Sequence, residues 1–180
     1  MGLFDHLRSL LNKPPADTTA SLAPEFAEES ALATERRARQ RVDAREGTKA
    51  LIIDDSPTIV AAIRKMLRSS GYETLEALDA EKGIEIARTQ QPDLIFLDIV
   101  LPGMNGFAAL RVMRKDPQTQ HIPIIMISGN EQAAEQFYAQ RIGADDFMKK
   151  PFSRFEVFAR IERLLDNNMV PRRKAMHMES

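Results

Sequence analysis

The stretch DLIFLD, residues 93–98, sets the architecture, because four consecutive apolar residues end in a carboxylate. An unbroken apolar run of this length is typical of a β-strand covered by helices on both faces. Two similar runs are ALII at 50–53 and PIIMIS at 123–128, and each precedes a longer amphipathic stretch. YETLEA at 72–77 and ADDFMK at 144–149 are weaker strand candidates. The alternation predicts an α/β fold: a doubly wound, five-stranded parallel sheet with helices on both faces.

Helix boundary signals agree with five βα units. Ser56 is a suitable N-cap, Pro57 suits the first helical turn, and Gly71 ends this first helix. Gly143 is expected to close the fourth helix. The remaining helices are predicted at about 79–90, 106–115, 131–142 and 153–166.

Composition excludes several classes of protein. The chain has 180 residues, of which 43% are hydrophobic and 28% charged, as in ordinary globular proteins rather than fibres or membrane proteins. The formal charge is −1, so no overall field attracts nucleic acid, and no nucleic-acid partner is expected. The absence of Cys excludes disulfides and thiol nucleophiles and suits a reducing compartment, so the cytoplasm is the expected location.

The chain divides into three predicted parts. Residues 1–48 comprise a short amphipathic helix followed by a flexible, charged linker, because hardly any bulky apolar residue occurs between Lys13 and Thr48. Residues 49–166 form the domain, and residues 167–180 are expected to be a disordered tail.

The amphipathic start carries apolar residues on one helical face and interrupts them with charge, so it is no signal peptide. Such a short helix could be disordered alone, or could dock on the domain itself, on a partner or at a membrane surface. A protein site is favoured over lipid, because the polar face is not strongly basic; any membrane contact would involve only residues 3–11. The apolar residues are Leu3, Phe4, Leu7, Leu10 and Leu11.

The candidate site residues follow the strands. In an open parallel sheet, ligands bind beyond the carboxyl ends of the strands, where Asp54, Asp55 and Asp98 are expected to converge. Three neighbouring carboxylates repel one another unless a cation lies between them, and Mg²⁺ prefers such oxygen ligands. Ser128 and Lys150 follow the fourth and fifth strands and could hold phosphoryl oxygens. This arrangement suits phosphoryl transfer to a carboxylate.

Taken singly, these residues have simpler interpretations. Asp54 or Asp55 could cap the helix that opens at Ser56, Ser128 could end a strand in a turn, and Phe147 could belong to the core. The three carboxylates together are harder to explain structurally, because buried carboxylates need partners.

From Lys49 to Asp166 the chain resembles the receiver domain of bacterial two-component response regulators. The resemblance rests on the pair Asp54-Asp55, on Asp98, on the loop LPGMNG at 101–106, on Ser128 and on KPF at 150–152, in this order. It implies a flavodoxin-like sheet with strand order 2-1-3-4-5.

The resemblance also implies roles for individual residues. Asp98 would accept a phosphoryl group from a histidine kinase or phosphotransfer protein, Asp54 and Asp55 would hold Mg²⁺ together with Asp98, and Lys150 would pair with the phosphoryl oxygens. Ser128 would move toward the phosphoryl group and Phe147 would swing inward, remodelling the face of helix four, strand five and helix five. Two flanking residues should influence dephosphorylation, Val100 and Asn130.

The function expected from the resemblance is a phosphorylation-dependent protein-interaction switch in a two-component phosphorelay, in the manner of chemotaxis or pilus-motility regulators. Apart from self-phosphorylation and autodephosphorylation, no enzymatic activity is expected. Alternatives are a phosphate sink or relay intermediate and a phosphorylation-independent scaffold. A haloacid-dehalogenase-like phosphatase is disfavoured, because Val100 stands where such enzymes carry a second acid.

Overall fold

The computed structural model describes residues 42–129 and 133–173. Its sheet has five parallel strands in the order β2-β1-β3-β4-β5, which confirms the predicted fold class and strand order. In chain order the strands are β1 (Lys49–Ile53), β2 (Glu73–Ala77), β3 (Leu94–Asp98), β4 (Ile124–Ser128) and β5 (Asp146–Lys149).

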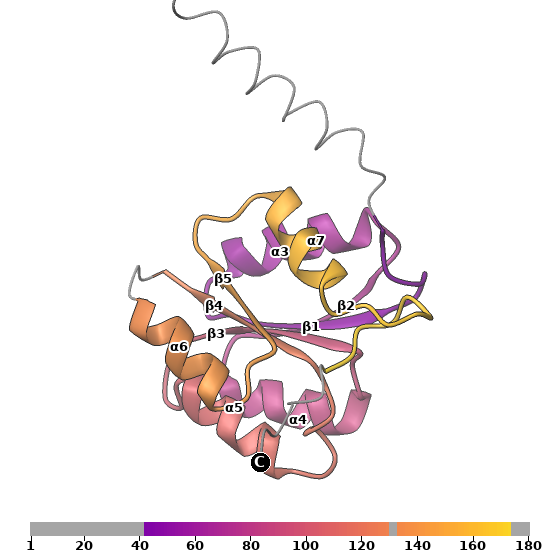
Figure 1. Cartoon of the computed structure of the whole chain (residues 1–180). Coiled ribbons are helices and arrows are strands. Elements are labelled where there is room, and N and C mark those ends of the chain that lie inside the picture. The colour runs from indigo at the N-terminus through magenta and orange to yellow at the C-terminus, as the bar shows by residue number, and fades with distance from the viewer. Residues whose placement is uncertain (1–41, 130–132, 174–180) are drawn as a thin grey trace, which may run out of the picture. The chain divides into compact units, whose positions relative to one another are not determined.

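Helices cover both faces of the sheet (Figure 1). The helices are α3 (Pro57–Arg68), α4 (Ala80–Gln90), α5 (Gly106–Lys115), α6 (Ala133–Arg141) and α7 (Arg154–Glu162). Helices α3 and α7 lie on one face, and α4, α5 and α6 lie on the other (Figure 1). None of the helices in the described part of the chain is long and apolar enough to cross a membrane.

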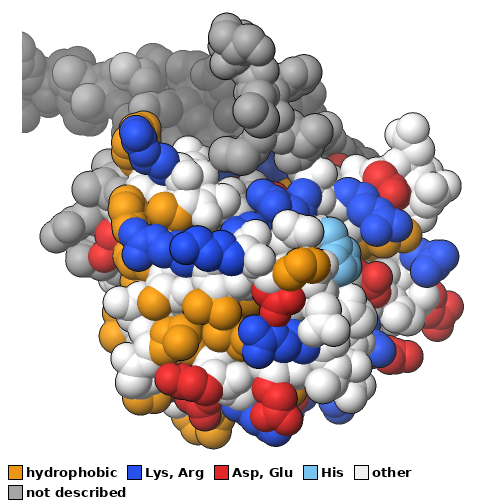
Figure 2. Space-filling model, turned by 90° about the horizontal axis from the view of Figure 1, so that it is seen from below, with side chains coloured by type: hydrophobic (Ala, Val, Ile, Leu, Met, Phe, Trp, Pro, Cys, Tyr) orange, Lys and Arg blue, Asp and Glu red, His pale blue; other side chains and the backbone are white. Residues whose placement is uncertain are grey.

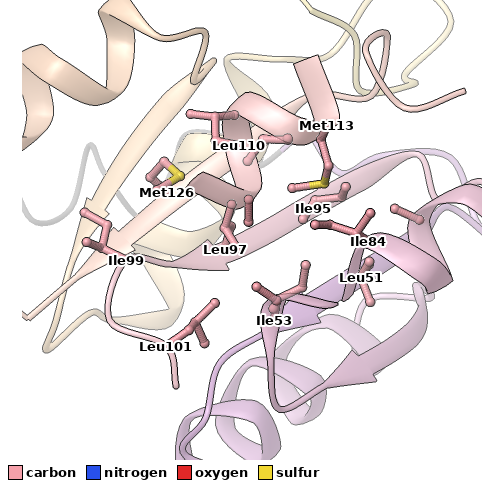
Figure 3. Close-up of a cluster of buried hydrophobic side chains, with 14 of the residues drawn as sticks. Leu51, Ile53, Ile84, Ile95, Leu97, Ile99, Leu101, Leu110, Met113 and Met126 are labelled. Carbon is pink, nitrogen blue, oxygen red and sulfur yellow. The ribbon is translucent and has the colours of Figure 1, made fainter. Parts of the chain in front are cut away.

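Alternate residues of each central strand enter two separate cores, because successive side chains of a strand point to opposite faces. On the side of α4, α5 and α6, Leu51, Ile53, Ile95 and Leu97 pack with other apolar side chains (Figure 3). On the side of α3 and α7, Phe96 packs with the other strand residues of that face. Apart from Lys49 at the start of β1, the three central strands are buried, which explains why their sequences are continuous apolar runs rather than alternating ones.

The outer surface of the layer formed by α4, α5 and α6 carries hydrophobic side chains next to basic ones (Figure 2). An aromatic contact also joins two helices of this layer. The ring of Phe107 on α5 packs edge to face against the ring of Tyr138 on α6, with 5.1 Å between the ring centres. The Arg111 guanidinium lies 5.3 Å from the Tyr138 ring centre. These contacts join α6 to α5 across the surface.

The compact unit begins earlier than residue 49, at Val42. Ala44 is buried, its N–H donates to the hydroxyl of Tyr72, and Gly47 N–H donates to the carbonyl of Gly71. Residues 42–48 therefore pack on the domain instead of ending the linker. The predicted amphipathic helix and most of the linker, residues 1–41, lie outside the described residues.

The C-terminal boundary also differs from the prediction. Helix α7 ends at Glu162, and the chain then turns back so that Leu165 and Pro171 form an antiparallel bridge. Val170 is buried, and Met169 accepts a hydrogen bond from Arg45 N–H. Residues 167–173 are thus a packed turn rather than the expected disordered tail, because Val170 is buried against the domain. Residues 174–180 lie outside the described part.

Candidate functional site

Two neighbouring strands bring the acidic residues together. Strands β1 and β3 are paired with Ile53 opposite Leu97, so that the next residues, Asp54 and Asp98, lie level at the carboxyl edge of the sheet. Asp55 follows directly in the turn into α3. Oxygen atoms of the three carboxylates lie within 4.8 Å of one another. The structure therefore assembles the acidic cluster that the sequence predicts.

Asp54 is the most buried member of the cluster, with none of its surface exposed. Its Oδ1 accepts a hydrogen bond of 2.9 Å from the N–H of Ser56, which is the N-cap of α3. Its Oδ2 lies 2.7 Å from Nζ of Lys150, yet accepts no well-aligned hydrogen bond from the described residues. Asp54 thus supports the first turn of the helix with one oxygen and presents the other to the acidic cluster.

Burial and charge raise the pKa of Asp98 to about 6. Desolvation of this buried carboxylate is the largest cause, and the negative charge of Asp54 adds to it. The ammonium of Lys150, with Nζ 3.1 Å from Asp98 Oδ1, acts in the opposite direction but does not cancel the increase. Within the described residues, the site thus brings three carboxylates together, two of which contact the ammonium of Lys150.

Lys150 reaches the carboxylates from the end of β5. Its backbone N–H donates to the carbonyl of Ser128 at 2.7 Å, which fixes the start of the side chain beside β4. Burial lowers the pKa of the Lys150 ammonium, but the contacts with Asp54 and Asp98 outweigh this effect, so the pKa lies above its ordinary value. Lys150 is therefore a fixed positive charge at the site.

The acidic cluster fits a hard divalent cation. Three carboxylates offer oxygen ligands, and the buried Oδ2 of Asp54, which contacts the Lys150 ammonium, accepts no aligned hydrogen bond from the described residues. Burial and the negative charge of Asp54 raise the pKa of Asp98, so a cation beside it would favour its charged form. Mg²⁺ is commonly held by one or two carboxylates while keeping several waters, and the exposed Asp55 leaves the cluster open on one side.

Ser128 ends β4 and is buried. Its hydroxyl donates a hydrogen bond of 2.6 Å to Oε2 of Glu135, in the first turn of α6. The sequence placed Ser128 at the site but gave no role to Glu135. The spacing between Ser128 and Glu135 in the sequence does not indicate a contact. Only the approach of α6 to the end of β4 brings the two side chains together.

The remaining predicted residues are placed as follows. Phe147 is already buried in the core on the side of α4, α5 and α6, so the simpler core interpretation describes it in this structure. Val100 is 69% exposed directly after Asp98 and Ile99. Asn130 lies outside the described residues. A Cβ atom on Gly129 would have nothing within 4 Å.

The loop from Asp98 to α5 depends on a close backbone approach. Gly106 N–H donates to the carbonyl of Ile99 at 2.9 Å, and a Cβ atom on Gly106 would collide with the carbonyl oxygen of Asp98. Gly103 adopts a positive φ of 72°, which glycine accommodates readily. The motif LPGMNG identifies this loop in the sequence. The need for glycine at position 106 follows only from its close approach to the carbonyl oxygen of Asp98.

The fold and this acidic edge agree with the comparison to protein families. Residues 50–162 match the model described as the response regulator receiver domain. The chain belongs to this family of two-component signalling domains.

Curated relatives are similar over the same part of the chain. Protein PilH of Pseudomonas aeruginosa is 40% identical over 101 residues, which cover 56% of this chain and 84% of PilH. The alkaline phosphatase synthesis transcriptional regulatory protein PhoP of Bacillus subtilis is 37% identical over 65% of this chain, but the match spans only 48% of PhoP. The chain spans about half the length of this second relative.

Solved structures show the same architecture. Chemotaxis protein CheY4 of Vibrio cholerae matches with a TM-score of 0.63 and 27% identity, covering 66% of this chain and 99% of that one. The receiver domain of the sensor histidine kinase PA1611 of Pseudomonas aeruginosa matches with a TM-score of 0.59 and 31% identity, covering 65% and 95%. The latter structure has a magnesium ion coordinated in its active site cleft.

Proposed function

We propose that this protein is a phosphorylation-dependent protein-interaction switch in which Asp98 accepts a phosphoryl group from a histidine kinase or a phosphotransfer protein. The observation that carries the proposal is the convergence of Asp54, Asp55 and Asp98 within 4.8 Å, with the ammonium of Lys150 between two of them. The family to which the chain belongs supports the same function.

In the proposed reaction, an oxygen of the Asp98 carboxylate bonds to phosphorus while the bond from phosphorus to the donor nitrogen breaks. Asp54, Asp55 and Asp98 would hold Mg²⁺, which when bound supplies positive charge beside the phosphoryl oxygens. Lys150 lies 3.1 Å from Asp98 and is placed to pair with a phosphoryl oxygen. Its present ion pair with Asp98 would then be exchanged for one with the acyl phosphate.

The proposed output surface is the face of α6, β5 and α7. Phe137 on α6 and Phe155 on α7 are both about two-thirds exposed, at 66% and 64%. Large exposed aromatic side chains are common anchors of protein interfaces. Ser128 and Phe147 would link the phosphoryl site to this face, because they end β4 and lie in β5.

The proposal is tested by intact-mass spectrometry after incubation with acetyl phosphate and Mg²⁺, on the wild type and on Asp98→Asn. We expect a single phosphoryl adduct on the wild type that a chelator abolishes and that Asp98→Asn lacks. If no adduct forms, NMR spectra with beryllofluoride and Mg²⁺ decide: the absence of any spectral change there would contradict the switch and support a phosphorylation-independent scaffold.

One observation favours a second candidate, a phosphate sink. Val100 is exposed and Gly129 has no side chain, so we expect neither position to shield a phosphoryl group on Asp98 from water. Loss of the adduct within seconds, together with no partner that prefers the phosphorylated protein, would support the sink and contradict the interaction switch.

The N-terminal extension is proposed to tether this cytoplasmic regulator to a larger complex. Its test is removal of residues 1–41 rather than 1–48, because residues 42–48 pack on the domain. Unchanged phosphorylation with lost localisation would support the tether, and unchanged localisation would contradict it.

A further inference from the structure

The hydroxyl of Ser128 already has a partner in this structure. Ser128 Oγ lies 2.6 Å from Oε2 of Glu135, a short contact typical of a hydroxyl donating to a charged carboxylate. The bond connects the last residue of β4 to the first turn of α6. It therefore joins the sheet edge that carries the acidic cluster to a helix of the proposed output face.

A serine hydroxyl carries one proton and can donate only one hydrogen bond at a time. Donation to Glu135 and donation to a phosphoryl oxygen on Asp98 are therefore mutually exclusive. The first arrangement must be given up before the second can form.

We propose that Glu135 is a positioning residue that holds Ser128 in the arrangement of the unphosphorylated protein and thereby limits how readily Asp98 is phosphorylated. This inference rests on the proposed function, because it assigns Ser128 to the phosphoryl group. When Ser128 is free to donate to the phosphoryl group in only a minor fraction of the molecules, the apparent affinity for the phosphoryl group is the intrinsic affinity multiplied by that fraction.

The same exchange of hydrogen-bond partners connects the phosphoryl site to α6. Once Ser128 donates to the phosphoryl group, the first turn of α6 loses this bond to β4. The helix is otherwise lightly buried on its outer side, since Phe137 is 66% exposed while Ala139 is fully buried. The exchange therefore alters one contact between the end of β4 and the first turn of α6.

The test compares Glu135→Ala and Glu135→Gln with the wild type in the full chain. The matched control is Gln136→Ala, the same kind of truncation at the exposed neighbouring position of the same helix. The measurements are the initial rate of phosphoryl adduct formation from acetyl phosphate and the affinity for beryllofluoride, both with Mg²⁺. A small donor is used because it needs no kinase-binding surface.

We expect Glu135→Ala to raise the rate and the affinity roughly three- to tenfold, because the competing charged acceptor is gone. Glutamine keeps an uncharged acceptor oxygen, so Glu135→Gln should lie between the wild type and Glu135→Ala. Gln136→Ala should behave as the wild type. This graded order distinguishes a role through the hydrogen bond from a general loosening of the helix.

A second arm repeats the series in a Ser128→Ala background, where Glu135 has no hydroxyl to hold. In this background Glu135→Ala should change neither the phosphorylation rate nor the affinity for beryllofluoride. If Glu135→Ala still raises both as much as it does in the wild type, the inference is overturned, because the effect then comes from loss of the negative charge of Glu135 and not from its hydrogen bond. A wild type that is phosphorylated as fast as Glu135→Ala also overturns it. A wild type that neither forms an adduct nor binds beryllofluoride overturns the proposed function instead.

Discussion

The two ends of the sheet use buried charge in opposite ways. At the carboxyl ends of the strands, three carboxylates lie close together, two of them contact the ammonium of Lys150, and the pKa of Asp98 is raised to about 6. At the amino ends, Asp145 precedes β5 and is fully partnered. Its Oδ2 accepts from Arg114 at 2.7 Å and from the N–H of Ile124 at 2.8 Å, and its Oδ1 accepts from Arg173 at 3.0 Å.

The difference separates stability from function. A carboxylate that accepts hydrogen bonds on both oxygens joins β4, α5 and the C-terminal turn at the start of β5, and little of its acceptor capacity is left for a ligand. A cluster with excess negative charge is costly in the free protein, and the cost is relieved when a cation arrives. Substitution of an aspartate should therefore lower the free energy of unfolding at the amino ends of the strands and raise it at the carboxyl ends.

The largest expected effect is at the paired end. Asp145→Ala should lower the free energy of unfolding by about 3–5 kcal/mol, because it leaves the buried Arg114 guanidinium without its carboxylate. Urea denaturation measures the change. The control is Glu85→Ala, which removes an exposed pair with Lys82 and should cost far less. Equal losses in the two variants would contradict the assignment of Asp145 as a structural centre.

At the acidic end, Asp98→Asn should stabilise the protein without Mg²⁺ by up to about 3 kcal/mol at neutral pH. The folded pKa of about 6 lies above the ordinary value of 3.8, so the folded state binds more protons between these values. The wild type therefore loses stability as pH rises from about 4 to 6, and the advantage of Asp98→Asn should appear over this range.

Thermal unfolding of both proteins from pH 3.5 to 7.5 measures this difference. Below pH 4 the two proteins should unfold at similar temperatures. Added Mg²⁺ should stabilise the wild type more than Asp98→Asn, since the carboxylate that the variant lacks is a proposed ligand. A variant that is less stable than the wild type at pH 7.5 would show that Lys150 already balances the cluster.

The smallest expected effect concerns the loop that supports Asp98. Gly106→Ala should cost about 1–3 kcal/mol, because its Cβ atom collides with the Asp98 carbonyl oxygen and the backbone must shift. Gly129→Ala is the matched control, since a Cβ atom there meets nothing within 4 Å. Thermal unfolding compares the two, and the phosphorylation rate of Gly106→Ala should fall with the displacement of Asp98. Identical stability of both variants would contradict the close approach.

The sequence predicted the sheet and its strand ends because burial on both faces leaves a local signal, a continuous apolar run that stops at a polar residue. Asp54, Asp98, Ser128 and Lys150 could be placed in this way, because each is the last residue of a strand or directly follows one. The ends of the domain could not, because the apolar residues that anchor them, such as Ala44 and Val170, stand alone in polar segments.

The sequence by itself therefore determined the α/β class, the alternation of elements and the residue types at the acidic edge, because periodicity and residue type are local properties. Only the tertiary structure decided which charges are balanced. The ion pairs of Asp145, the raised pKa of Asp98 and the bond from Ser128 to Glu135 all join groups brought together by folding. Electrostatic energy depends on distance and desolvation, and both are fixed only when the elements pack.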